Sequence, residues 1–399
     1  MLHVSQLFFV PLCPKVSNYM NQKLSHIDFE QAGADVFCFD NGTQVREYHA
    51  IIRVQQACLP FAQQVEAVLN AYNSLLAQLP GAQAVFKRYF LSDAANQADA
   101  IVVNDVTDCA KSIIQQAPLD GTKVALWVWL MTDVQTSMTQ SELYEVSHGQ
   151  FRHLFNASAH NLAANSEYQM RLLFNEYIMQ LAQERCTLAD NCIRTWLFVN
   201  DIDLNYGGVV RARNQVFFTQ GLTVNTHFIA STGIGGRQQD PNVLAQMDNY
   251  AIAGVRPEQV HYLYAPTHLN RTSDYGVSFE RGTMVSYADR RHVFISGTAS
   301  INNKGEVMYP NDIVKQTQRM WENVEALLVE ADCNFDDVAH MIVYLRDVAD
   351  YQLVRSLYAE RFPGKPCVIV HAPVCRPGWL IEMECMAVKA VCLPNMPQF

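Results

Sequence analysis

The sequence lacks the features that most readily identify nucleic-acid-binding and membrane-spanning proteins. Its 399 residues include 29 Lys and Arg against 39 Asp and Glu, a formal net charge of −10, and the basic residues are scattered rather than clustered. A nucleic-acid surface normally needs a basic patch, so we expect no nucleic-acid partner. No stretch reaches the roughly 18 uninterrupted apolar residues of a membrane helix, so we also expect no membrane partner.

The usual spacings of metal and disulfide chemistry are also missing. The eleven cysteines form no C-x-x-C pair and the twelve histidines no H-x-x-x-H pair, so we expect reduced thiols and no metal or other cofactor. The segment MLHVSQLFFVPLCPKVSNYM (1–20) has neither a basic start nor a small-residue cleavage site, so we expect no signal peptide and a cytoplasmic protein. The glycine-rich STGIGG (231–236) lacks a full dinucleotide fingerprint and is interpreted as a loop.

Two acids interrupt an apolar strand near the C-terminus. In WLIEMECMAV (379–388), the alternation of side chains across a strand places Glu382 and Glu384 on one face. The pattern alone leaves open whether they face solvent or lie buried in a site. If they are buried, desolvation and the neighbouring Glu384 would raise the pKa of Glu382, and such a carboxyl can act as a general acid near neutral pH.

One supersecondary pattern recurs along the chain. Residues 174–218 and 321–362 each contain an amphipathic helix, a cysteine, a β-rich strand ending near an aspartate, and a second helix, and a weaker copy lies nearer the start. We predict an α+β fold made of strand–strand–helix–strand–helix–strand units, with helices on one face of each sheet. The predicted units are a degenerate N-terminal unit at 1–140, a middle unit at 141–255 and a C-terminal unit at 256–399.

The third unit resembles the YjgF/RidA family, whose units have a chorismate-mutase-like fold. FISGTASINNKGE (294–306), QTQRMWENVEALLVEADCNFDDVAHMIVYLRDVADY (316–351) and WLIEMECMAV follow the motifs of that family in order and spacing. Members are trimers with active sites in the clefts between subunits. The resemblance therefore implies that three fused units form a pseudo-trimer, active as a monomer or as a weak homo-oligomer.

The commonest activity of that family is the hydrolysis of enamines and imines, in which an arginine holds the substrate carboxylate. The resemblance would place this arginine in a P-A-R context, where the present sequence has Val368 after Lys-Pro-Cys. Phe279 stands where the deaminases have a tyrosine. Both departures count against a deaminase, which remains an alternative.

The chain as a whole looks like the chorismatases, a YjgF-related family that removes pyruvate from chorismate. The resemblance rests on the three-unit length, on RTWLFVNDI…YGGVVRARNQVFF…HFIASTGIGG in the middle, and on SFERG before FISGTAS. It implies that Glu382 is the catalytic acid. It also implies that Cys375, with Gly282, marks the subgroup that releases 3-hydroxybenzoate. Hydrolysis to a dihydroxycyclohexadiene carboxylate, a dihydrodiol, and release of 4-hydroxybenzoate remain open.

The expected substrate is a dicarboxylate, so we expect cationic side chains to bind its two carboxylates. Arginine offers the planar, bidentate fit to a carboxylate, and the candidates are Arg213, Arg281 and Arg376. Tyr206 and Tyr275 are further candidates for substrate contacts.

Glu384 and Cys375 have supporting roles in this hypothesis. We expect Glu384 to tune or position Glu382, and Cys375 to shape the pocket or assist proton loss from the ring, with Arg376 lowering the pKa of the thiol. A ligand-binding member of the fold without catalysis is the remaining alternative.

Overall fold

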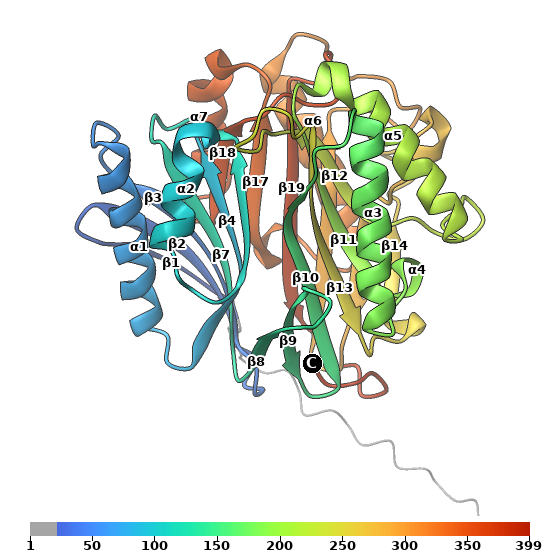
Figure 1. Cartoon of the computed structure of the whole chain (residues 1–399), viewed down its shortest axis with the longest axis horizontal. Helices are drawn as coiled ribbons and strands as arrows, with labels where there is room; N and C mark the ends of the chain where they lie inside the picture. The colour runs from blue at the N-terminus through green and yellow to red at the C-terminus, as the bar shows by residue number, and fades with distance from the viewer. Residues whose placement is uncertain (1–21) are drawn as a thin grey trace, which may run out of the picture.

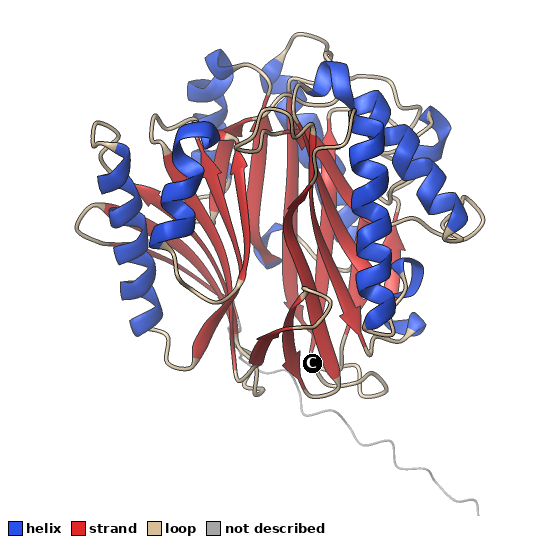
Figure 2. Ribbon diagram, in the orientation of Figure 1, coloured by secondary structure: helices blue, strands red, loops and turns tan. Residues whose placement is uncertain are grey.

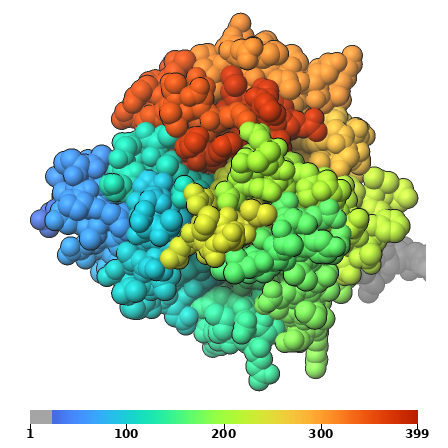
Figure 3. All heavy atoms as spheres, turned by 45° about the horizontal axis from the view of Figure 1, so that its top comes forward, coloured from blue at the N-terminus to red at the C-terminus, as the bar shows by residue number. Residues whose placement is uncertain are grey.

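The computed structural model describes residues 22–399, so the segment for which we expected no signal peptide lies outside the described residues. Three sheets stand around a common centre, and their helices lie on the outside of the molecule (Figures 1 and 2). Figure 3 shows the early, middle and late parts of the chain as three sectors of one body. The predicted α+β class with repeated units is confirmed.

The first sheet has the strand order β1-β2-β3-β7-β4-β5. Its strands are β1 (Gln22–Asp28), β2 (Ala32–Phe39), β3 (Glu47–Val54), β4 (Ala82–Leu91), β5 (Ala110–Gln115) and β7 (Val124–Thr132). Its helices are α1 (Phe61–Ala77) and α2 (Ala94–Asn104). Strands β4 and β5 pair in parallel, since α2 carries the chain back between them.

The second sheet repeats this arrangement in the order β8-β9-β10-β13-β11-β12, read from its other edge. Its strands are β8 (Gln135–Met138), β9 (Tyr144–His148), β10 (Phe151–His160), β11 (Cys192–Val199), β12 (Ala230–Gly235) and β13 (Ala245–Ala253). Its helices are α3 (Ser166–Gln183), α4 (Leu188–Asn191) and α5 (Ile202–Thr219). Here β11 and β12 are the parallel pair.

The third sheet has the order β14-β15-β16-β19-β17-β18, extended by β6 of the first unit. Its strands are β14 (Val260–Leu263), β15 (Gly282–Ser286), β16 (Arg290–Ala299), β17 (Val338–Leu345), β18 (Cys367–His371), β19 (Ile381–Ala390) and β6 (Ala117–Pro118). Its helices are α6 (Ile313–Glu330) and α7 (Tyr351–Arg361). Strands β17 and β18 are parallel.

Each unit therefore begins with three meandering strands, not with the two that we predicted. The extra strand is easily missed because β8 and β14 have only four residues each, too few to show an alternating pattern. The division of the chain at residues 140 and 255 stays a prediction.

The last strand of each unit lies inside its sheet and is buried on both faces. Every residue of β7 and β13 is buried, and β19 is buried from Ile381 to Val388. Helices cover the outer face of each sheet and the other two sheets cover the inner face, which explains the nearly continuous apolar runs. A side chain on the inner face of β19 therefore points into the interior of the molecule.

Two further observations bear on the sequence-based expectations. Among the residues that the structure describes, no helix combines the length and the apolar character needed to cross a membrane. Of the cysteines within residues 22–399, nine carry free thiols, as expected, but the expectation fails at Cys392, which is disulfide-bonded.

Candidate active site

Both acids of β19 are buried. Glu382 is 4% exposed and Glu384 is 2% exposed, which excludes the alternative in which they face solvent. Burial of a carboxylate is costly unless it is paired or protonated. The two acids meet this requirement in different ways.

Glu384 is held as a carboxylate in a buried ion network. Trp196 Nε1 donates to it at 2.7 Å and Arg194 Nη2 at 2.8 Å. Arg88 lies 3.6 Å away and donates to Asp248 at 2.9 Å. Two arginines thus face two acids, and the network joins β4 of the first sheet, β11 and β13 of the second, and β19 of the third.

Among residues 22–399 Glu382 has no such partner, and its carboxyl is protonated near neutral pH. Burial raises the pKa of Glu382 to about 8, and the charge of Glu384 raises it further, against the smaller opposing effects of Arg281 and Arg194. The role of Glu384 in tuning Glu382 stays a prediction. A carboxyl with this pKa can donate a proton at pH 7 and is unusual outside functional sites.

Glu382 lines a cavity between the second and third sheets. The second sheet contributes residues of α5 and β12, and the third contributes the end of β16 and the segments before β15 and β19. The lining residues are Tyr206, Arg213, Ser231, Gly233, Tyr275, Val277, Phe279, Arg281, Gly297, Ala299, Ile301, Cys375, Arg376, Trp379 and Glu382. The free volume is about 40 Å³, less than a ring-sized ligand fills.

Seven of the nine predicted site residues line this cavity, although they come from segments up to 176 positions apart (Tyr206 to Glu382). The other two do not. Glu384 points into the ion network instead. Gly282 lies on β15, where an added Cβ would stand 3.1 Å from the Leu263 side chain and from the Phe294 carbonyl oxygen.

The cavity contains an arginine without a counter-ion. Arg213 is 1% exposed, and its Nε and Nη2 have no hydrogen-bond partner among the described residues. A buried, unpaired guanidinium is unfavourable unless an anion completes it. Arg211, two residues earlier on α5, points to the surface and pairs with Glu167. Arg213 is therefore the strongest candidate for binding an anionic ligand.

The other two arginines of the cavity are partly engaged. Arg281 donates from Nε and Nη2 to Asn270, and its side chain also interacts with the Tyr275 hydroxyl. Arg376 lies 4.8 Å from the ring centroid of Tyr275 and 5.3 Å from that of Trp379, which are cation–π distances.

Cys375 does not have the activated thiol that the neighbouring Arg376 suggested. Burial raises the pKa of the thiol to about 12, and the charge of Glu382 raises it further. Tyr206 and Arg376 act in the opposite direction but do not compensate. The thiol is therefore protonated, which suits a role in shape or hydrogen bonding better than one as a thiolate.

Two glycines, Gly233 and Gly297, make room for this site, and a third packs closely beside it. A Cβ at Gly297 would lie 1.9 Å from Glu382 Oε1, and one at Gly233 would lie 2.8 Å from the Tyr206 ring. Gly235 is equally tight against Pro373. The interpretation of STGIGG as a loop is wrong: residues 230–235 form β12, and its glycines permit close packing. The only sequence signal was the glycine content itself.

Val368, where the sequence comparison expected the deaminase arginine, is not near Glu382. It lies on β18 and lines a different cavity, between the first and third sheets. The strand that faces Glu382 is β12 of the second unit, since a strand of one unit completes the cavity of the next. Val368 therefore says little about the chemistry beside Glu382.

Comparison with known proteins agrees with this architecture. Residues 283–389 match a family described as Endoribonuclease L-PSP. A RutC family protein of Pyrococcus abyssi is 35% identical over 99 residues, which are 24% of this chain and 78% of that protein. A second, from Saccharolobus solfataricus, is 33% identical over 100 residues, 25% of this chain and 79% of that protein.

The chain belongs to the RutC family. The expectation of a YjgF/RidA-like C-terminal unit is confirmed. The chain also resembles a chorismatase crystal structure, with a TM-score of 0.59 and 17% identity over 76% of this chain and 93% of that one. This likeness concerns the fold, and it confirms the expected chorismatase-like arrangement of three units.

Proposed function

We propose that the protein is a chorismatase that cleaves the enolpyruvyl ether of chorismate and releases pyruvate and 3-hydroxybenzoate. The observation that carries the proposal is the protonated, buried Glu382 in one cavity with the unpaired Arg213. Glu382 can supply a proton, and the unpaired guanidinium of Arg213 favours binding of an anion. The likeness of the fold to a chorismatase supports the choice of substrate.

Glu382 is the general acid of this proposal. Its proton adds to the terminal methylene carbon of the enolpyruvyl group, and an oxocarbenium-like centre develops at the neighbouring carbon. The bond between the ring carbon and the ether oxygen then breaks, and pyruvate leaves with that oxygen and its new methyl group. The neighbouring ring hydroxyl closes on the vacated carbon and returns its proton to Glu382. Opening of this epoxide with loss of the ring hydrogen gives 3-hydroxybenzoate, so no water is consumed. A carboxyl with a pKa of about 8 is protonated when substrate arrives and is still a far stronger acid than water.

The arginines hold the two carboxylates of the substrate. Arg213 and Arg281 approach the cavity from the second and third units respectively, so the substrate would bridge them. Arg376 and the rings of Tyr206 and Tyr275 complete the contacts.

Cys375 selects the product in this proposal. Formation of 3-hydroxybenzoate consumes no water, whereas formation of the dihydrodiol consumes one. A thiol beside the ring occupies space that a water would need and assists the proton loss that makes the ring aromatic.

The test is incubation of the purified full-length protein with chorismate, with pyruvate followed by a coupled assay and aromatics by chromatography. We expect pyruvate and 3-hydroxybenzoate, and a loss of roughly 10²–10⁴ in kcat for Glu382→Gln. Glu145→Gln, a change on the second sheet outside the cavity, is the matched control. Absence of pyruvate would refute the proposal and favour the enamine/imine deaminase or a binding protein. Hydrolysis of an enamine substrate would then indicate the deaminase. Binding of chorismate without turnover would indicate the binding protein.

A further inference from the structure

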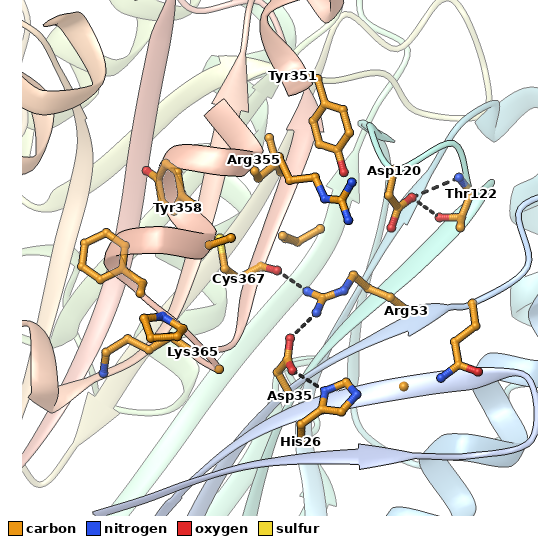
Figure 4. A pocket seen from close by; sticks show the side chains of 18 of the residues that line it. His26, Asp35, Arg53, Asp120, Thr122, Tyr351, Arg355, Tyr358, Lys365 and Cys367 are labelled. Atoms are coloured by element: carbon orange, nitrogen blue, oxygen red, sulfur yellow. Dashed lines mark hydrogen bonds and ion pairs between the residues drawn. The ribbon is translucent and has the colours of Figure 1, made fainter. Parts of the chain in front are cut away.

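A second and larger cavity, of about 780 Å³, lies between the first and third sheets (Figure 4). Helix α7 and strand β18 form one wall. The opposite wall is formed by β2, by β3 and the residues after it, and by the loop before β7. The proposed function uses none of these residues.

This cavity is built from the same elements as the one that contains Glu382. In both, one wall is the parallel edge strand of a sheet with the helix that precedes it: β12 with α5, and β18 with α7. The opposite wall is in both cases the end of the third strand of the next sheet, β16 or β3, together with the segment before its last strand. The two cavities are therefore counterparts in the pseudo-trimer.

The counterpart of the catalytic acid is an alanine. Tyr344, the last residue but one of β17, pairs with Glu382. Phe90, the last residue but one of β4, pairs in the same way with Ala125. Ala125 also pairs with Arg53 of β3, which lines the second cavity. The second cavity is therefore formed by the same structural elements as the first but lacks the proton donor.

The lining of the second cavity has more cations than anions. Its ionisable side chains at neutral pH are Arg53, Arg355, Lys365, Asp35 and Asp120. The hydrogen bond to Asp35 raises the pKa of the His26 imidazole, which favours its charged form. The cavity therefore favours an anionic ligand.

Most of these charges already have partners. Arg53 pairs with Asp35 and donates to the Cys367 carbonyl oxygen. Lys365 donates to backbone carbonyl oxygens at 3.2 and 3.4 Å. Asp120 accepts from the backbone and the hydroxyl of Thr122.

Arg355 is the exception. Within residues 22–399 it makes no hydrogen bond and no ion pair, and Figure 4 shows its guanidinium pointing into the open space near Tyr351 and Asp120. The same helix contributes Tyr351 and Tyr358 to the cavity lining, and Phe362 follows directly after its end. A free guanidinium beside aromatic rings fits a planar ligand that carries a carboxylate.

We propose that the second cavity binds a small aromatic carboxylate, with the carboxylate on Arg355 and the ring against Tyr351. The ligand is held there without proton transfer, since Ala125 replaces the acid. This site is separate from the one that contains Glu382, and its existence does not depend on the proposed function.

The test is calorimetric titration of the full chain with benzoate, a probe that needs no enzymatic turnover. We expect saturable binding that is weakened roughly tenfold by Arg355→Gln, the loss of one charge-assisted contact. Arg361→Gln is the matched control: it lies on the same helix, pairs with Glu325 and does not line the cavity. It should bind benzoate like the wild type, and so should Arg213→Gln in the other cavity.

Three outcomes overturn the proposal. If the wild-type protein shows no saturable binding of benzoate, the proposed site does not exist. Binding that is lost in Arg213→Gln but kept in Arg355→Gln assigns benzoate to the cavity of Glu382. Equal binding of benzamidine, which carries a positive charge on the same ring, shows that the carboxylate is not recognised.

Discussion

Arg194 Nη2 donates a hydrogen bond of 2.8 Å to Glu384 across the boundary between the second and third sheets. Glu384 raises the pKa of Glu382, two residues away, and Arg194 lowers it. The protonation of Glu382 therefore depends on a charge balance to which two units contribute.

Removing the charge of Glu384 should shift the pH dependence of activity. In Glu384→Gln, Arg194 acts on Glu382 without opposition, so the pKa of Glu382 falls and the alkaline limb of the kcat/KM profile moves to lower pH. Breaking a buried ion network in this way also costs roughly 3–5 kcal/mol of stability. Asp248→Asn removes a charge from the same network farther from Glu382. Asp248→Asn should destabilise the protein but shift the alkaline limb of the kcat/KM profile much less. An equal shift in both variants would contradict the role of Glu384 in raising the pKa of Glu382.

The raised pKa of Glu382 predicts how stability depends on pH. A carboxyl whose pKa rises from 4.5 unfolded to about 8 folded stabilises the fold fully below pH 4.5, and this contribution is lost as pH rises toward 8. Above pH 8 the wild type must bury a charge that Glu382→Gln does not have. In thermal unfolding experiments between pH 5 and pH 9, the stability of the variant relative to the wild type should increase with pH, by up to roughly 4 kcal/mol. Parallel curves for the two proteins would mean that the carboxyl is not desolvated.

Gly297 is expected to be essential for activity but not for folding. A Cβ there would lie 1.9 Å from Glu382 Oε1, so Gly297→Ala displaces the acid from its position. We expect kcat to fall by roughly 10²-fold, the effect of a misplaced catalytic group. Gly378→Ala, where the nearest atom is 3.6 Å away, is the control and should keep full activity. Circular dichroism and thermal unfolding establish that both variants fold.

Arg213 and Arg211 form a matched pair on one helix. Arg213→Gln should raise KM by roughly 10²-fold through the loss of charge-assisted hydrogen bonds to a substrate carboxylate. It should not lower stability, because the guanidinium that it removes is buried without a partner. Arg211→Gln breaks an exposed pair with Glu167 and should leave KM unchanged. A normal KM in Arg213→Gln would rule out this arginine as a carboxylate ligand.

The role of Cys375 is tested by the products. Cys375→Ala should change the ratio of products from 3-hydroxybenzoate toward the dihydrodiol, because a smaller side chain admits water and removes the thiol. Cys367→Ala, at a cysteine that lines the other cavity, should leave the ratio unchanged. Chromatography of both reactions decides the matter. A Cys375→Ala enzyme that still forms only hydroxybenzoate excludes the proposed role.

The cavity that contains Glu382 shows which features can be predicted from sequence patterns and which cannot. The alternation in WLIEMECMAV correctly placed Glu382 and Glu384 on one face of a strand, since the period of a strand is local. It could not decide between solvent and burial, because that depends on what covers the inner face. Two units far away in sequence cover it.

The errors have the same origin. STGIGG resembled a loop because nothing near it in sequence reveals that Tyr206 and Pro373 pack against its glycines. Val368, at the position expected for the deaminase arginine, lines the cavity between the first and third sheets, and the strand that faces Glu382 belongs to the preceding unit. The ion network was not predicted at all, since Arg88, Arg194 and Glu384 are each more than 100 residues apart.

The sequence by itself determined most of the elements, their threefold recurrence and the positions of the two acids, because these follow from local periodicity and from motifs. The tertiary structure alone decided which acid is ionised. Glu384 meets Arg194 and Trp196 of another unit and keeps its charge. Glu382 meets none of these and keeps its proton, since a buried carboxyl without a cationic partner is more stable neutral.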